Sequence, residues 1–163
     1  MKICNHHTLR GLAILFASVA AISVMAQNSQ HVHEAAGELD LELDEGKRWG
    51  TDASLRTGMS RIREAFEQKL PGFGDQSLTT RDYEALADVV DTQLGFMFEN
   101  CDLPPAADAQ LHRLLGFIAG ASAGLREQDR RRAGMASLHR SLDAYATYFD
   151  HPGWGDEAGR TPH

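Results

Sequence analysis

Three side chains with sulfur or imidazole donors, Met59, Cys101 and His112, could bind a metal ion if the fold brings them together. Thioether, thiolate and imidazole are ligands of Cu(I), and imidazole also binds Cu(II), zinc and nickel. His31 and His33 add an imidazole pair near the N-terminus, which could form an accessory site. These residue types predict a metal site, with copper as the preferred ion.

Each of these side chains also has an ordinary structural explanation. Methionine often fills gaps in a core, and cysteine often behaves as a small buried hydrophobe. His112 follows Asp108 by four residues, a spacing at which two side chains on one helix face can form a hydrogen bond. His31 and His33 could belong to a mobile tail that holds no ligand. Both explanations stay open at the level of sequence.

No catalytic motif is present. The chain contains no G-x-S-x-G, no H-E-x-x-H and no P-loop. It also has no C-x-x-C-H, which excludes covalent c-type haem, and no pair of Glu-x-x-His motifs on two helices, as di-iron bundles require. We therefore expect a protein without enzymatic activity.

Residues 1–26 have the parts of a secretory signal peptide. Lys2 and Arg10 give a positive start, an apolar run continues to Met25, and small residues at positions 24 and 26 predict cleavage after Ala26. The apolar run is short for a membrane anchor. We expect a periplasmic protein that is not held in the membrane after cleavage.

Cleavage of the signal peptide would change the length, the net charge and the number of cysteines of the mature chain. The full chain has 163 residues and a net charge of −7; the expected mature chain has 137 residues, with 14 basic against 23 acidic side chains, a charge of −9. This acidic balance does not favour nucleic-acid binding. Cys101 becomes the sole cysteine, so an internal disulfide is excluded and the thiol must be buried, ligand-bound or free for an intermolecular bond.

The mature chain divides into a leader and four helical patterns. Residues 27–50 are polar and predict a flexible, largely disordered leader, in which the alternation at 38–44 could form one strand without a partner. Apolar residues then recur at helical spacing in four segments, followed by a tail at 155–163. The segments run from about Asp52 to Leu70, Thr79 to Asn100, Pro104 to Leu125 and Met135 to Phe149.

Local signals mark the helix ends. Thr79 and Asp82 have capping-box spacing, and the prolines at 104 and 105 suit a first helical turn. Pro71 and the glycines after it predict a stop, and the small-residue run 119–124 lets a neighbouring helix approach closely. Short connections predict an all-α, antiparallel up-down-up-down four-helix bundle over residues 51–154.

In that topology Met59, Cys101, His112, Tyr145 and His151 share one end of the bundle. Trp49 and Trp154 belong to the same end, where they either cap the core or form a partner surface. The leading hypothesis is a non-catalytic copper-binding or copper-buffering protein. The alternative is a periplasmic interaction or structural module without a metal.

Three stretches resemble a family of small exported bacterial proteins, some of them labelled DnrO. They are LDEGKRWGTDASLRTGMSRIREA, NCDLPPAADAQLHRLLGFIAGA and LDAYATYFDHPGW, within residues 43–154. The pattern is also similar, at the level of fold, to periplasmic four-helix b-type cytochromes. That resemblance implies haem between Met59 and a last-helix histidine, but Ala146 stands at the histidine position, so haem is not expected.

Overall fold

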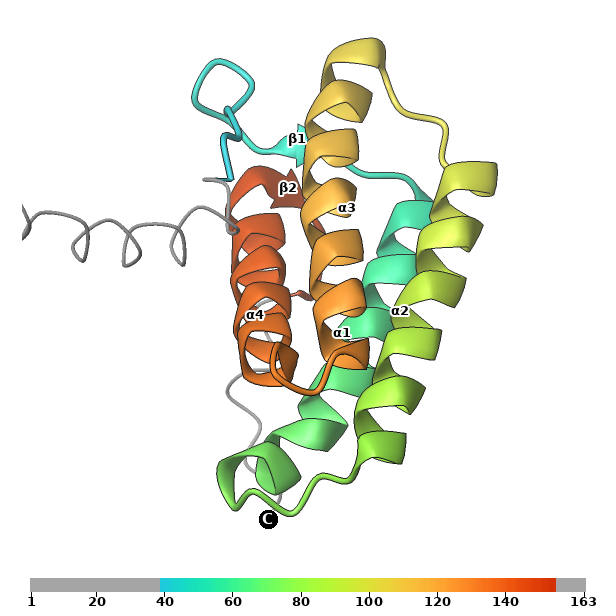
Figure 1. Ribbon diagram of the computed structural model, residues 1–163. Helices are drawn as coiled ribbons and strands as arrows, with labels where there is room; N and C mark the ends of the chain where they lie inside the picture. Colours follow the sequence, from blue (N-terminus) through green and yellow to red (C-terminus); the bar gives the residue numbers. More distant parts are fainter. Residues whose placement is uncertain (1–38, 155–163) are drawn as a thin grey trace, which may run out of the picture. The chain divides into compact units, whose positions relative to one another are not determined.

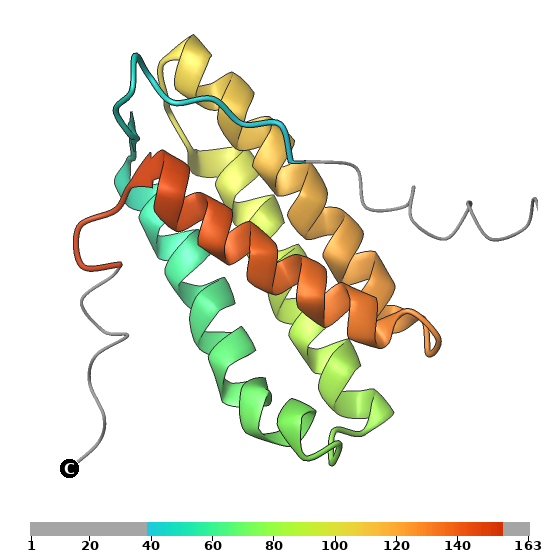
Figure 2. The same cartoon turned by 90° about the vertical axis from the view of Figure 1, so that its left-hand side faces the viewer.

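The computed structural model describes residues 39–154. Within them lie four helices, α1 (Ala53–Gly74), α2 (Thr80–Asn100), α3 (Pro105–Arg126) and α4 (Arg131–Tyr148), and two short strands, β1 (Trp49–Gly50) and β2 (Phe149–Asp150). The helices lie lengthwise beside one another (Figures 1 and 2). The predicted all-α class is confirmed. The predicted signal peptide and C-terminal tail lie outside the described residues.

Most helix ends follow the predicted signals. The Asp52 carboxylate accepts a 2.6 Å hydrogen bond from the Leu55 N–H and caps α1. Thr79 and Asp82 form the predicted capping box at the start of α2, and α3 begins at Pro105. The predicted stop at Pro71 is wrong, because α1 continues through its last turn to Gly74.

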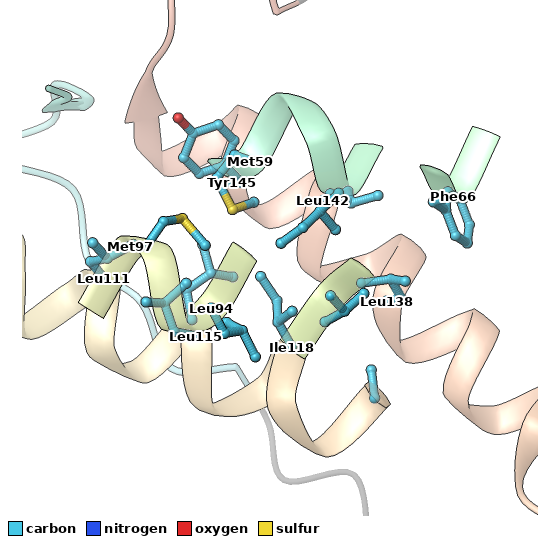
Figure 3. Close-up of a cluster of buried hydrophobic side chains, with 14 of the residues drawn as sticks. Met59, Phe66, Leu94, Met97, Leu111, Leu115, Ile118, Leu138, Leu142 and Tyr145 are labelled. Atoms are coloured by element: carbon cyan, nitrogen blue, oxygen red, sulfur yellow. The ribbon is translucent and has the colours of Figure 1, made fainter. Parts of the chain in front are cut away.

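The core consists of apolar side chains from all four helices. Figure 3 shows part of it, with the Met59 and Met97 thioethers among aliphatic and aromatic groups. The predicted stripes are largely buried, although Leu70 is 41% exposed. The largest fully buried side chains are Tyr145, Phe149, Leu55, Met59, Ile62, Leu86, Met97, Leu111, Leu114, Leu115, Ile118 and Leu125.

Helices α3 and α4 pack closely where two glycines meet. A Cβ atom added to Gly134 would lie 2.8 Å from the backbone nitrogen of Leu125, and one on Gly124 would lie 3.3 Å from the Gly134 Cα. Neither position has room for a larger side chain unless the helices separate. The small-residue run permits this close approach at Ala121 and Gly124, whereas Gly120 of the same run has no atom within 4 Å of an added Cβ.

Residues 39–50 differ from the predicted flexible leader. Leu41 is 7% exposed and belongs to the core. The Glu42 N–H donates to the side-chain oxygen of Gln110, and Arg113 donates to the carbonyl oxygen of Asp40, both at 3.1 Å. The segment therefore packs on α3, because Leu41 is buried there and the backbone at residues 40 and 42 forms hydrogen bonds with α3 side chains.

The sequence predicts one strand without a partner at residues 38–44, but the two strands within residues 39–154 are β1 and β2. β1 pairs in parallel with β2, so that Trp49 lies opposite Phe149 and Gly50 opposite Asp150. The helical spacing predicts Phe149 as the last position of the fourth helix, but α4 ends at Tyr148. The pairing joins the segment before α1 to the end of α4.

Candidate functional site

The end of the molecule near the start of α1 contains several of the predicted residues. The Asp52 carboxylate accepts a hydrogen bond of 2.6 Å from the Asp102 N–H, so the connection after α2 lies against the start of α1. The Asp52 carboxylate also acts on the Cys101 thiol, whose pKa it helps to raise. The Tyr145 hydroxyl is 2.9 Å from Nδ1 of His151. The Asp52–Asp102 bond joins two of the chain segments that were predicted to share this end.

His112 lies at the surface of α3. Its side chain is 55% exposed, and Nδ1 lies 3.3 Å from a carboxylate oxygen of Asp108 and 3.0 Å from the Asp108 carbonyl oxygen. Its ring is 5.6 Å from that of Phe98. Met59, by contrast, is fully buried. The Asp108–His112 pairing that the four-residue spacing permitted is present.

The metal hypothesis therefore lacks a preformed cluster in the described part of the chain. Across residues 39–154, no group of three or more His, Cys, Asp or Glu side chains is placed to hold a metal ion. Burial, followed by the nearby Asp52 carboxylate, raises the pKa of the Cys101 thiol to about 12. A metal would have to displace that proton. His31 and His33 lie outside the described residues, and the metal site stays a prediction.

The two tryptophans pack on the core. Both Trp49 and Trp154 are partly buried against it. The Trp49 indole N–H donates to the Glu42 carbonyl oxygen at 2.6 Å. The Trp154 ring meets Tyr145 edge-on, with ring centroids 4.6 Å apart, and the Arg63 guanidinium lies 4.4 Å from its centroid. These contacts match the capping role that was weighed against a partner surface.

Helices α2 and α3 share an exposed surface whose glycines and exposed phenylalanine are not explained by packing within the chain. We define the α2–α3 outer face as seven of the exposed residues of these two helices: Gly95, Phe98, His112, Gly116, Ala119, Gly120 and Ala123. Five of the seven are glycine or alanine, and Phe98 is 57% exposed. Charged side chains such as Glu99 and Arg113 are exposed beside them.

Side-chain contacts fix the borders of this face. At one end, Phe98 of α2 meets His112 of α3. At the other end, the Arg126 guanidinium binds the carboxylates of Asp88, at 2.9 Å, and of Asp91. Gly95 lies between Asp91 and Phe98 along α2 at helical spacing, and the small residues of α3 lie between His112 and Arg126.

The glycines on this face are not required by the fold. A Cβ atom added to Gly95, Gly116 or Gly120 would meet no atom within 4 Å, whereas one on Gly134 would strike backbone. A glycine inside a helix costs about 1 kcal/mol relative to alanine. Three such positions on one face therefore destabilise the isolated chain without an internal contact that requires them.

Sequence reasoning missed this face because it followed the apolar stripes. Phe98 immediately follows the core residue Met97 and does not belong to its stripe. An aromatic residue outside the buried stripe, with Gly95 three residues before it, is the sequence feature that indicates an exposed face. The three glycines also fall between the buried positions of their helices.

Comparisons with protein-family models, curated proteins and solved structures found no match to this chain. None of the four helices within residues 39–154 is long and apolar enough to cross a membrane.

Proposed function

We propose that this chain is an exported, non-catalytic interaction module, and that its α2–α3 outer face binds a helix of a partner protein. The observation that carries the proposal is the set of open glycines beside the exposed ring of Phe98. A helix can approach another most closely where side chains are small, which increases backbone and side-chain contact. The exposed ring supplies an aromatic anchor at one end of the face.

The architecture that we infer for the module is an antiparallel up-down-up-down bundle. Its support is the short connections between consecutive helices and the packing of α1 on α2, α2 on α3 and α3 on α4. In such a bundle α2 and α3 present a continuous outer surface. Export to the periplasm is supported by the signal-peptide pattern of residues 1–26.

Photo-cross-linking in intact cells tests the proposed function. A benzoylphenylalanine residue at position 98 should form a discrete adduct in which the partner peptide is helical and comes from another protein. The matched control places the same residue at Ala136, an exposed position of α4. Equal adducts from both positions, no adduct from position 98, or an adduct only with a second copy would contradict the proposal.

Copper binding remains the second candidate function. One observation favours it: Cys101 lies in the connection held against the start of α1, the helix that carries Met59. A Cu(I) ion there would replace the proton of the Cys101 thiol and use soft sulfur donors. Titration of the purified protein with Cu(I) against a chromophoric competitor tests this candidate. The combined variant Cys101→Ser with His112→Ala should lose one bound ion per chain, and an unchanged stoichiometry would exclude the bundle site.

A further inference from the structure

Residues 149–154, which follow α4, connect the end of that helix to α1 and to the segment before it. We call them the C-terminal clasp. Its strand pairs with β1, and the Thr51 hydroxyl donates a 2.6 Å hydrogen bond to the Asp150 carbonyl oxygen. At its far end, Arg63 of α1 donates to the carbonyl oxygen of Trp154. The clasp is thus attached both to the segment before α1 and to the middle of that helix.

His151 is central to the contacts of the clasp. Its Nδ1 is the hydrogen-bond partner of the Tyr145 hydroxyl, which belongs to a fully buried residue. Its ring lies 4.9 Å from that of Trp154, and its carbonyl oxygen accepts a 3.0 Å bond from the Trp154 N–H. Because Tyr145 is buried, its hydroxyl would lose its partner if His151 moved away.

Burial and two nearby arginines disfavour a protonated imidazole at His151. Partial burial, followed by the positive charges of Arg56 and Arg63, lowers the pKa of His151. Burial also raises the pKa of Tyr145, which stays a neutral hydroxyl. The charged and titratable groups around the Tyr145–His151 pair are Arg56 and Arg63 on α1, Asp52 at its start, Cys101 after α2, and Asp150 in β2.

The sign of the pH effect follows from the lowered pKa. The clasped state favours neutral imidazole, so a released His151 binds a proton more readily than a clasped one. The stabilisation is fully present above the ordinary histidine pKa of about 6.5 and is lost as pH falls from there through the lower pKa of the clasped state. Acid therefore favours release.

We propose that the C-terminal clasp is an acid-sensitive element, and that protonation of His151 releases its last residues, 151–154, from Tyr145 and from Arg63 of α1. The arrangement carries this inference because one imidazole joins the buried Tyr145 hydroxyl to Trp154 while two arginines of α1 are close by. The proposal is independent of the α2–α3 outer face, since none of its residues belongs to that face.

Trp154 fluorescence tests the clasp directly. The chain has two tryptophans, so the variant Trp49→Phe leaves Trp154 as the only reporter. As pH falls from 7.5 to 5, its emission maximum should shift to longer wavelength with one midpoint below about 6.5, while the helical circular dichroism stays constant. No shift across this range, or a shift only together with loss of helix, would overturn the proposal.

Two histidine substitutions provide the matched comparison. In the Trp49→Phe background, His151→Gln should remove the pH midpoint, because its amide can bond to Tyr145 but does not titrate. His139→Gln should retain it, since His139 is on the exposed side of α4 near Phe66. Direct titration of the His151 ring by NMR gives a second measurement. A midpoint that persists in His151→Gln, or a His151 pKa at or above 6.5, would contradict the proposal.

Discussion

The carboxylate of Asp52 accepts a 2.6 Å hydrogen bond from the backbone N–H of Asp102, 50 positions further along the chain. The same carboxylate caps α1 through the Leu55 N–H. One side chain therefore satisfies an amide at a helix start and an amide in the connection between α2 and α3. This relationship holds together the end of the molecule at which Cys101 and Tyr145 lie.

Asp52→Ala should lower the free energy of unfolding by about 1–2 kcal/mol, because an N-cap is lost. Urea unfolding followed by circular dichroism measures the change. Asp143→Ala is the control, since this exposed carboxylate lies 3.7 Å from the His139 ring nitrogen and its loss should change stability by less than about 0.5 kcal/mol. Equal effects of the two substitutions would contradict the capping role of Asp52.

The Cys101 thiol should react slowly with alkylating agents in the folded protein. A pKa of about 12, against an ordinary value of 9.0, reduces the thiolate fraction at pH 8 by roughly two to three orders of magnitude. Iodoacetamide labelling followed by mass spectrometry measures the rate, with the urea-unfolded chain as reference. Asp52→Asn should speed labelling, because it removes a negative charge, although burial, the larger cause, remains. Folded and unfolded chains that react at the same rate would show an accessible thiol.

Two glycine-to-alanine substitutions should change stability in opposite directions. Gly134→Ala should destabilise by about 1–3 kcal/mol, because its Cβ would lie 2.8 Å from a backbone nitrogen of α3. Gly120→Ala should stabilise by about 0.5–1 kcal/mol, because its Cβ meets no atom within 4 Å. Chemical denaturation of the two variants gives the comparison. A loss of stability in Gly120→Ala would mean that the fold requires this glycine.

The helices were predictable because their signals are local. The capping box at Thr79 and Asp82 and the two prolines at the start of α3 act within one turn. The strand pair was not predictable in this way. Phe149 falls four residues after Tyr145, in phase with the α4 stripe, and only its pairing with Trp49, far away in sequence, draws it into β2. Leu41 is a similar case, since its burial depends on packing against the assembled helices.

In the candidate sites too, contacts within one helix were predictable and contacts that depend on the packed fold were not. The Asp108–His112 pair follows from spacing along one helix and was foreseen. The hydrogen bond between Tyr145 and His151 depends on how the chain turns after α4, which a helical period does not describe. The α2–α3 outer face depends on what two helices leave uncovered. Which glycines are crowded and which are open becomes known only when the helices are packed.

The central claim is that open glycines on the α2–α3 outer face serve a partner helix. Its most direct test is the yield of the position-98 cross-link in cells when Gly120 is changed to Leu, with Ala136→Leu on α4 as control. Gly120→Leu should leave the isolated chain at least as stable, because the position is open, yet reduce the adduct at least tenfold. Ala136→Leu should leave the adduct unchanged. An undiminished adduct in a stably folded Gly120→Leu chain would contradict the account.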